Sequence, residues 1–279
     1  MVTATKTRKT NGYAEINGGD LYYEIAGEGD TIALSHAAFI DSGQWDPQFD
    51  EFAQQYRVIR FDNRGNGRSA KPAGAVSRRD DMYKLLQHLG VERAAIVGSS
   101  MSGEAALDLA IEHPDLVSAL VLVGAIPSGF QVVGEPPRYM QEMAQTLQGG
   151  DTKAASELQI RIWVDGEYRE PTEVDPSIRR RASAMNKKVV ENKTYLIADA
   201  SPLKPLNPPA MECLKSLKVP ALVVVGDLDS PEIRRASDIM ADGIPGAKQV
   251  TITGAGHVPN MEKPQEFNQA VLSFLRGIH

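Results

Sequence analysis

Short apolar runs recur along the chain, and most are followed by a segment whose hydrophobic positions repeat with the period of a helix. The runs predict buried strands over residues 31–35, 56–61, 94–98, 117–124, 221–226 and 247–252. The helix-period segments cover residues 46–52, 78–89, 101–112, 231–240 and 264–275. This alternation favours right-handed βαβ crossovers, and therefore an α/β fold whose mostly parallel sheet carries helices on both faces. In such sheets, ligands bind at the carboxyl ends of the strands.

A hairpin is predicted ahead of this sheet. Two short alternating segments between Tyr13 and Ile25 flank the sequence Asn17-Gly18-Gly19-Asp20. Asn and Gly tolerate the positive φ angles that a tight hairpin turn requires. We therefore expect the chain to begin with two antiparallel strands.

One long gap interrupts the alternation. Residues 125–215 separate two predicted strands that a single helix could have joined, and connections in compact domains are usually short. The sequence therefore predicts an α/β core formed by residues 1–124 and 216–279, with an inserted helical cap, residues 125–215. Within the cap, helices are expected near 138–147, 152–164 and 176–196, followed by a coil containing Pro202, Pro205, Pro208 and Pro209.

A serine-rich turn separates one predicted strand from the helix that follows it. A nucleophile at such a junction has a strained backbone, and the residues two before and two after it must be small. Ser100 satisfies this rule with Gly98 and Ser102, whereas Ser99 is flanked by Val97 and Met101 and Ser102 by Ser100 and Glu104. Ser102 stands where Gly is usual. A serine-rich turn that only caps a helix is the alternative.

One histidine lies where a general base is expected. His257 follows the last predicted strand in a glycine-rich loop, Thr253 to Pro259, and comes after Ser100 in the chain. A histidine with only a structural hydrogen bond is the alternative. The other histidines suit structural or exposed positions, and one of them, His36, would support the loop after the strand 31–35; the rest are His88, His113 and His279.

The acid should follow a strand between the nucleophile and the histidine, since the chain order in this type of triad is Ser, acid, His. Val223 to Asp229 offers two candidates, Asp227 and Asp229. We choose Asp229, because Asp227 directly follows Gly226 and is better placed to bond the amides of its own turn. The other suitable loop, residues 124–129, contains no carboxylate.

Composition narrows the function further. The net charge is −6 and the isoelectric point about 5.5, so the chain lacks the basic surface on which nucleic-acid binding depends. No apolar stretch is long enough to span a bilayer, and the single cysteine, Cys213, fits a reducing cytoplasm. No metal-ligand cluster, phosphate loop or dinucleotide fingerprint occurs, so no cofactor is implied.

Taken together, these segments resemble the α/β-hydrolase superfamily over nearly the whole chain outside the cap. Members carry an oxyanion loop, an Asp-x-Arg-Gly-x-Gly-x-Ser segment, a nucleophile elbow, a Gly-x-x-Asp loop and a Gly-x-Gly-His loop. The corresponding segments here are His36-Ala37-Ala38, Asp62 to Ser69, the turn at Ser100, Gly226 to Asp229 and Gly254 to His257. Ala37 replaces the usual Gly of the oxyanion loop.

The resemblance implies a mechanism and a site. Ser100, His257 and Asp229 would form a catalytic triad, and the backbone N–H groups of Ala38 and Met101 would form the oxyanion hole, with Phe39 as the alternative to Ala38. Apolar residues near the substrate would be Phe39, Met101, Trp163 and Val258. The chain is similar to capped esterases and lactonases, including enol-lactone hydrolases, so a small-molecule ester or lactone is the expected substrate. No nucleic-acid or membrane partner is expected.

Other activities share these residues. Carbon–carbon bond hydrolases and perhydrolases with haloperoxidase activity use the same triad on this fold, and the fold also hosts ligand receptors without activity. Epoxide hydrolases and haloalkane dehalogenases place Asp at the nucleophile position, which Ser100 argues against. The sequence does not separate esters from lactones, nor does it give the oligomeric state.

Overall fold

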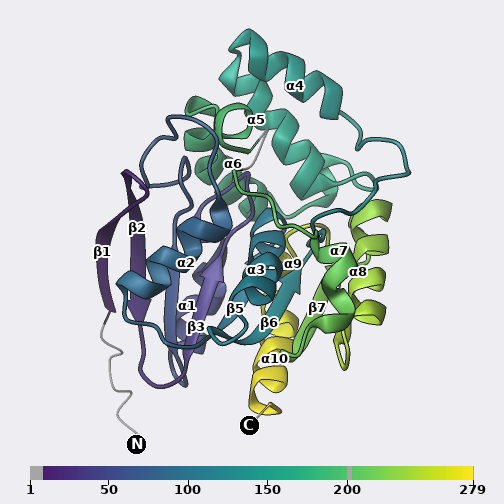
Figure 1. Ribbon diagram of the computed structural model, residues 1–279. Helices are drawn as coiled ribbons and strands as arrows, with labels where there is room; N and C mark the ends of the chain where they lie inside the picture. The colour runs from purple at the N-terminus through teal and green to yellow at the C-terminus, as the bar shows by residue number, and fades with distance from the viewer. Residues whose placement is uncertain (1–8, 200–202, 279) are drawn as a thin grey trace, which may run out of the picture.

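The computed structural model describes residues 9–199 and 203–278, which form an eight-stranded sheet with helices on both faces (Figure 1). The strands lie in the order β1-β2-β4-β3-β5-β6-β7-β8. Their bounds are β1 Lys9–Ile16, β2 Gly19–Ala26, β3 Thr31–Ser35, β4 Arg57–Phe61, β5 Ala94–Ser99, β6 Val117–Val123, β7 Ala221–Gly226 and β8 Lys248–Ile252. The predicted fold class is confirmed, and the six runs predicted as buried strands agree with these bounds to within one residue, whereas β1 begins four residues before Tyr13.

The sheet combines a parallel body with an antiparallel hairpin. Strands β3 to β8 are parallel, and β2 joins them by antiparallel pairing with β4. The predicted hairpin turn is confirmed, with Asn17 at φ 49° and Gly18 at φ 76°. These positive φ values are the ones that Asn and Gly adopt at low cost.

The helices cover the two faces of the sheet, and their bounds are α1 Asp46–Phe52, α2 Arg78–His88, α3 Met101–Glu112, α4 Met140–Gly149, α5 Thr152–Ile160, α6 Pro176–Glu191, α7 Ala210–Cys213, α8 Pro231–Gly243, α9 Pro259–Glu262 and α10 Pro264–Arg276. Strand β6 shows how the faces divide, because its side chains alternate. Leu120 and Leu122 pack with α2, α3 and α8, whereas Val121 and Val123 pack with α1 and α10. Within the described ranges, no helix has both the length and the apolar character to cross a membrane.

The described part of the segment predicted as a cap lies above the carboxyl ends of the strands (Figure 1) and contains α4, α5 and α6. Helix α5 continues as predicted to Val164, but its last turn, Arg161–Asp165, is a π-helix. The prediction of one continuous helix to residue 196 was partly wrong, since α6 ends at Glu191 and a π-helix, Tyr195–Asp199, follows only after a break. Lys193 adopts φ 53°, which breaks the helix, and Asn192 and Thr194 instead donate hydrogen bonds to the carbonyl of Gly65. Pro202 and His279 lie outside the described residues.

Candidate active site

Ser100 occupies a strained turn between β5 and α3. Its backbone lies at φ 56° and ψ −122°, a region that non-glycine residues seldom adopt. The turn is crowded, because a Cβ at Gly98 would lie 2.4 Å from the carbonyl oxygen of Ser102, and one at Gly103 would lie 2.5 Å from the Cβ of Ala125. The steric rule used to choose Ser100 therefore describes real contacts in this turn.

Ser102 does more than fit where a Gly is usual. Its hydroxyl donates a hydrogen bond to the carbonyl oxygen of His36 at 2.7 Å, and it accepts from Asn63 Nδ2 at 3.1 Å. Ser35 Oγ lies 2.9 Å away and donates to the same hydroxyl. The variant residue of the elbow thus connects α3 to the oxyanion loop.

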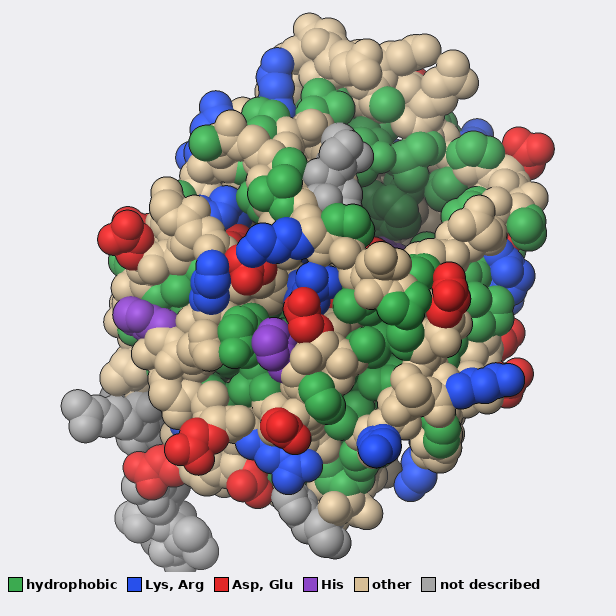
Figure 2. Space-filling view, viewed as in Figure 1, with side chains coloured by type: hydrophobic (Ala, Val, Ile, Leu, Met, Phe, Trp, Pro, Cys, Tyr) green, Lys and Arg blue, Asp and Glu red, His purple; other side chains and the backbone are tan. Residues whose placement is uncertain are grey.

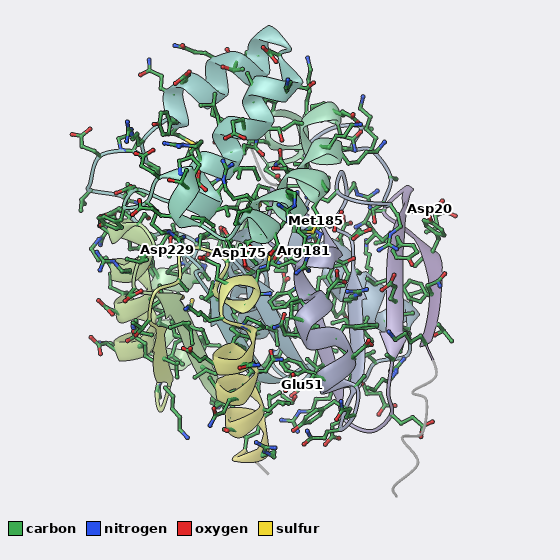
Figure 3. All side chains as sticks on the ribbon, turned by 180° about the vertical axis from the view of Figure 1, so that it is seen from behind. Asp20, Glu51, Asp175, Arg181, Met185 and Asp229 are labelled. Carbon is green, nitrogen blue, oxygen red and sulfur yellow. The ribbon has the colours of Figure 1, made fainter. Side chains whose placement is uncertain are left out.

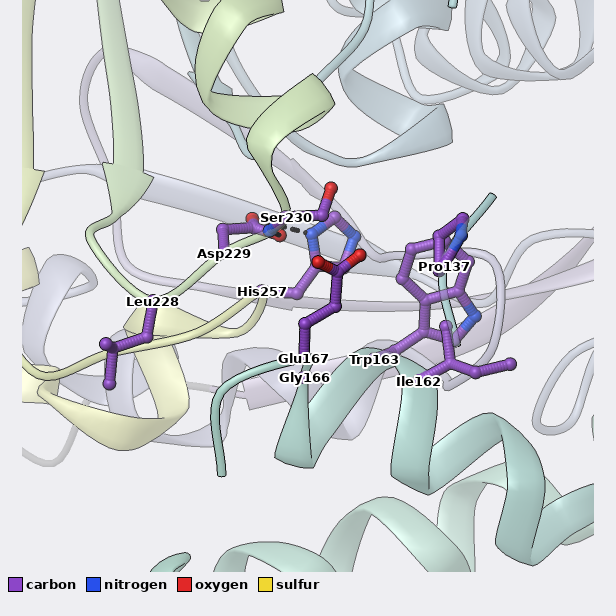
Figure 4. Close-up of a pocket in the computed structure, with 9 residues that line it drawn as sticks. All are labelled: Pro137, Ile162, Trp163, Gly166, Glu167, Leu228, Asp229, Ser230 and His257. Atoms are coloured by element: carbon purple, nitrogen blue, oxygen red, sulfur yellow. Dashed lines mark hydrogen bonds and ion pairs between the residues drawn. The ribbon is translucent and has the colours of Figure 1, made fainter. Parts of the chain in front are cut away.

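His257 and Asp229 come together at the carboxyl ends of β8 and β7. Asp229 Oδ2 lies 2.8 Å from His257 Nδ1, and the two residues are only 4% and 3% exposed (Figure 4). The other carboxylate oxygen, Oδ1, accepts from the backbone N–H of Ser230. Because Nδ1 faces the carboxylate, Nε2 is the nitrogen left to act as a base, and it has no hydrogen-bond partner among the described residues. Contact between Nε2 and a serine often tightens only when substrate binds.

Asp227, the rejected candidate for the acid, was expected to bond the amides of its own turn. That expectation was wrong. Asp227 Oδ1 accepts from the backbone N–H of Gly254 at 2.7 Å, so it connects the β7 turn to the loop that carries His257. Two parallel neighbouring strands place their following loops side by side, and the amide that Asp227 bonds belongs to the other loop.

The predicted oxyanion loop, after β3, contains backbone N–H groups that make no hydrogen bond to described residues. Within the described residues, the backbone N–H groups of Ala38, Phe39 and Met101 donate no hydrogen bond. His36 supports this loop, as predicted: it accepts from the N–H of Asn63 at Nε2, while Nδ1 lies 2.8 Å from the carbonyl oxygen of Ala37. Burial lowers the pKa of His36 to about 4, so the ring is neutral near pH 7.

Trp163 is the predicted pocket residue that lies against the candidate triad. Its ring stands 5.0 Å from the His257 ring and 6.4 Å from the Phe39 ring, measured between centroids. Figure 4 shows Trp163 and Glu167 around His257 in a small cavity. Phe39 and Val258 are buried in the apolar cluster between cap and core.

A larger groove adjoins this cavity and shares Pro137, Trp163, Glu167 and Ser230 with it. The space within the groove is about 610 Å³, and Figure 2 shows a hollow lined by hydrophobic side chains beneath the predicted cap. Its apolar walls come from the predicted cap and from helix α8 of the core. These residues are Ile126, Val132, Pro136, Pro137, Met140, Trp163, Pro231 and Ile233. An apolar group attached to a reacting carbonyl could lie here.

A family comparison agrees with this geometry. The model of the family described as alpha/beta hydrolase fold matches residues 30–264. The chain belongs to this family. Members of this fold carry their triad in the chain order Ser, acid, His, and Ser100, Asp229 and His257 follow one another in that order here.

Individual members of the family indicate the reaction. The sequence is 26% identical over 272 residues to an Azorhizobium caulinodans protein named as a carbamate hydrolase, covering 94% of this chain and 97% of that one. The enol-lactonase of Burkholderia xenovorans LB400 matches with a TM-score of 0.76 and 28% identity, over 95% and 100% of the two chains. The N-acyl homoserine lactone degrading enzyme Est816 matches with a TM-score of 0.74 and 29% identity, over 94% and 100%. With further homologues named carboxylesterase and enol-lactonase, these support ester or lactone hydrolysis.

Several residues of this α/β hydrolase site were missed by sequence reasoning. Gly124, at φ 53°, lies directly against the His257–Asp229 pair. A Cβ at this position would lie 3.1 Å from His257 Nδ1 and 3.2 Å from Asp229 Oδ2. The positive φ and this contact require Gly, and the signal was its place directly after a buried strand. Gln44 and Asn260 are buried polar residues beside the site, and no local pattern distinguishes them from surface amides.

The cap reaches the histidine loop through an ion pair that was also missed. Arg169 pairs with Glu262, and both side chains are at least nine-tenths buried. Glu262 Oε1 accepts from the N–H of Gly256, next to His257. Arg169 also donates to the carbonyls of Val164 and Asp165, which directly follow Trp163. One side chain thus connects the Trp163 turn to the His257 loop.

Proposed function

We propose that this α/β hydrolase cleaves carboxylic esters or lactones through an acyl-enzyme on Ser100. Ser100 Oγ attacks the carbonyl carbon while His257 Nε2 takes the hydroxyl proton. The tetrahedral intermediate then expels the alcohol, which receives that proton. Water, deprotonated by His257, attacks the acyl-enzyme and releases the acid and the free serine.

The buried pair of His257 and Asp229 is the observation that carries this proposal. A carboxylate that accepts from Nδ1 fixes the tautomer whose Nε2 lone pair is free, and it stabilises the imidazolium that forms during attack. The amides of Met101 and Ala38, with Phe39 as the alternative, would hold the developing oxyanion. Removal of one such donor in other enzymes costs roughly 3 to 4 kcal/mol of transition-state stabilisation.

We further infer that the cap, residues 125–215, shapes the substrate site over the core, residues 1–124 and 216–279. The groove under the cap would take an apolar acyl or alcohol group, with Trp163 between it and His257. Glu135, Glu167 and Glu232 also line the groove, against one cation, Arg138. This balance disfavours anionic groups at that end of the site.

Serine labelling combined with an ester series tests the proposal. The protein is treated with a fluorophosphonate probe, and the labelled peptide is identified by mass spectrometry. Wild type, Ser100→Ala and a control, Ser273→Ala at an exposed serine of α10, are assayed on p-nitrophenyl esters of increasing chain length. We expect label on Ser100 and loss of turnover by roughly 10⁴-fold or more in Ser100→Ala only.

Other outcomes would redirect the assignment. Turnover that survives in Ser100→Ala would exclude this serine as nucleophile. Lactones, a carbamate, a β-diketone and a peroxide assay are included, and esters and lactones as the poorest substrates would favour one of the related reactions. A large thermal shift with a ligand and no turnover of any substrate would favour a receptor.

A further inference from the structure

One buried glutamine contacts all three loops that carry the proposed chemistry. Gln44 is fully buried in the short turn Ser42–Trp45, which follows the oxyanion loop. Its Oε1 accepts from the backbone N–H of Ala37 at 2.8 Å. Its Nε2 donates to Ser99 Oγ and to Asn260 Oδ1, both at 3.0 Å. Ala37 precedes the proposed oxyanion amide, Ser99 precedes the proposed nucleophile, and Asn260 follows His257 by three residues.

The contacts of Gln44 continue into a buried network of side-chain amides. Asn260 Nδ2 donates back to the carbonyl of Gln44 and to Gln48 Oε1, both at 3.0 Å. Gln48 Nε2 donates to Asn268 Oδ1 at 2.7 Å, and Asn268 Nδ2 donates to Glu51 Oε2 at 2.6 Å. Figure 3 labels Glu51 on α1, farther from the cap than Asp229. The network therefore begins at the site and extends away from it along α1.

We propose that Gln44 is a positioning residue for hydrolysis: its single amide group sets the oxyanion loop, the elbow and the histidine loop at fixed distances from one another. This proposal rests on the proposed function. Three contacts from one planar group define relative positions that the separate loops do not define alone. A displacement near 1 Å in such a site costs about 10²-fold in rate.

The geometry favours this role over a purely structural one. A buried amide must satisfy its donors and acceptor, and apolar side chains could fill the same space without that requirement. Here both Nε2 donors and the acceptor are used, and each partner lies in or beside a loop that carries the chemistry. Because the N–H of Ala37 is held, the peptides that follow it, with the free amides of Ala38 and Phe39, are restrained at their starting point.

The same network provides a matched control. Gln48 is equally buried, and it contacts Asn260 and Asn268 but neither Ala37 nor Ser99. Loss of its amide should cost stability to a similar degree, since comparable hydrogen bonds are broken. Substitution of Gln44, but not of Gln48, should lower the rate of the chemical step in addition to this loss of stability.

The experiment compares Gln44→Met, Gln44→Glu and Gln48→Met with the full-length wild type. Measured are kcat and KM on the best p-nitrophenyl ester, the melting temperature, and the rate of fluorophosphonate labelling. We expect kcat to fall about 30- to 100-fold in Gln44→Met, with KM within about threefold. Gln48→Met should show a similar decrease in melting temperature but keep kcat within about threefold of wild type. Gln44→Glu retains the acceptor for Ala37 and should regain part of kcat.

Each other outcome opposes the proposal. Equal kcat losses in the two Met variants would make the role structural, and unchanged kcat in both Gln44 variants would exclude positioning, although ester hydrolysis itself would stand. If Gln44→Met does not fold, the near-isosteric Gln44→Glu decides by the same criterion, a fall in kcat with KM nearly unchanged. If wild type is labelled but turns over no ester, the proposed function fails, and equal labelling rates would then also reject positioning. Absence of any label on wild type would overturn both proposals.

Discussion

The elbow in the core and the turn that carries Trp163 in the cap are positioned by different kinds of contact. At the elbow, the strained backbone of Ser100 and the crowding between Gly98 and Ser102 act between residues close in the sequence. The cap turn depends on side chains distant in sequence, such as Arg169, whose partner Glu262 is 93 residues away. Local sterics shape the turn of the proposed nucleophile, and long-range polar contacts hold the turn that carries Trp163.

The cap contacts the site loops at a second point. Asn186 on α6 donates to the carbonyl of Phe39 at 2.7 Å and to Gln159 Oε1 at 2.6 Å. Figure 3 shows Arg181 and Met185 of the same helix at the boundary with the core. Changes in the cap should therefore alter the site through its loops, whereas changes at the triad should stop the reaction directly.

The largest expected effect in this comparison comes from the core. Asp229→Asn should lower kcat by roughly 10³- to 10⁴-fold with the fold intact, because the amide stabilises the wrong imidazole tautomer. Asp227→Asn, two residues earlier, should lose less than tenfold, since Asp227 bonds only Gly254. Ester kinetics and circular dichroism on both variants check this. Equal losses, or a larger one in Asp227→Asn, would contradict the choice of acid.

A smaller effect is expected when the cap is disconnected from the histidine loop. Arg169→Met should lower kcat/KM about tenfold, since the carbonyls of Val164 and Asp165 lose their donor and Glu262, which accepts from Gly256, is left buried without its cation. Arg181→Met breaks another contact between cap and core, to the carbonyl of Gly43, and should change kcat/KM less than threefold. Kinetics over the ester series, with thermal melts, distinguish the two. Similar kinetics for both variants would show that cap contacts do not act through the His257 loop.

The same contrast explains what the sequence could predict. Strand and helix periods located the sheet, and small flanking residues singled out Ser100 among three serines. His257 and Asp229 followed from loop position, and the structure brings them together. Gln44 and Asn260 interact across 216 residues, and an amide buried at such a contact has the same local sequence as one at the surface. Burial and partner, which tertiary packing decides, were the missing information.

The smallest expected effect concerns stability and lies one turn beyond the elbow. Burial, with Asp108 nearby, raises the pKa of Glu104 to about 7. The folded protein therefore keeps this proton up to a higher pH than the unfolded chain does, so the stability from the neutral carboxyl is fully present below about pH 4.5 and is lost as pH rises through 7. Over this interval the free energy of unfolding should fall by about 2 kcal/mol less in Glu104→Gln than in wild type, allowing for the partial exposure of Glu104.

Urea unfolding of wild type and Glu104→Gln at steps from pH 4 to pH 8 measures that difference. Asp108→Asn removes the neighbouring carboxylate and should shift the wild-type decline to lower pH. Parallel stability curves for wild type and Glu104→Gln would contradict the raised pKa. A decline seen only in wild type would show that the helix positioning Ser100 contains a neutral carboxyl, so the core side of the site also includes a polar group that local sequence did not reveal.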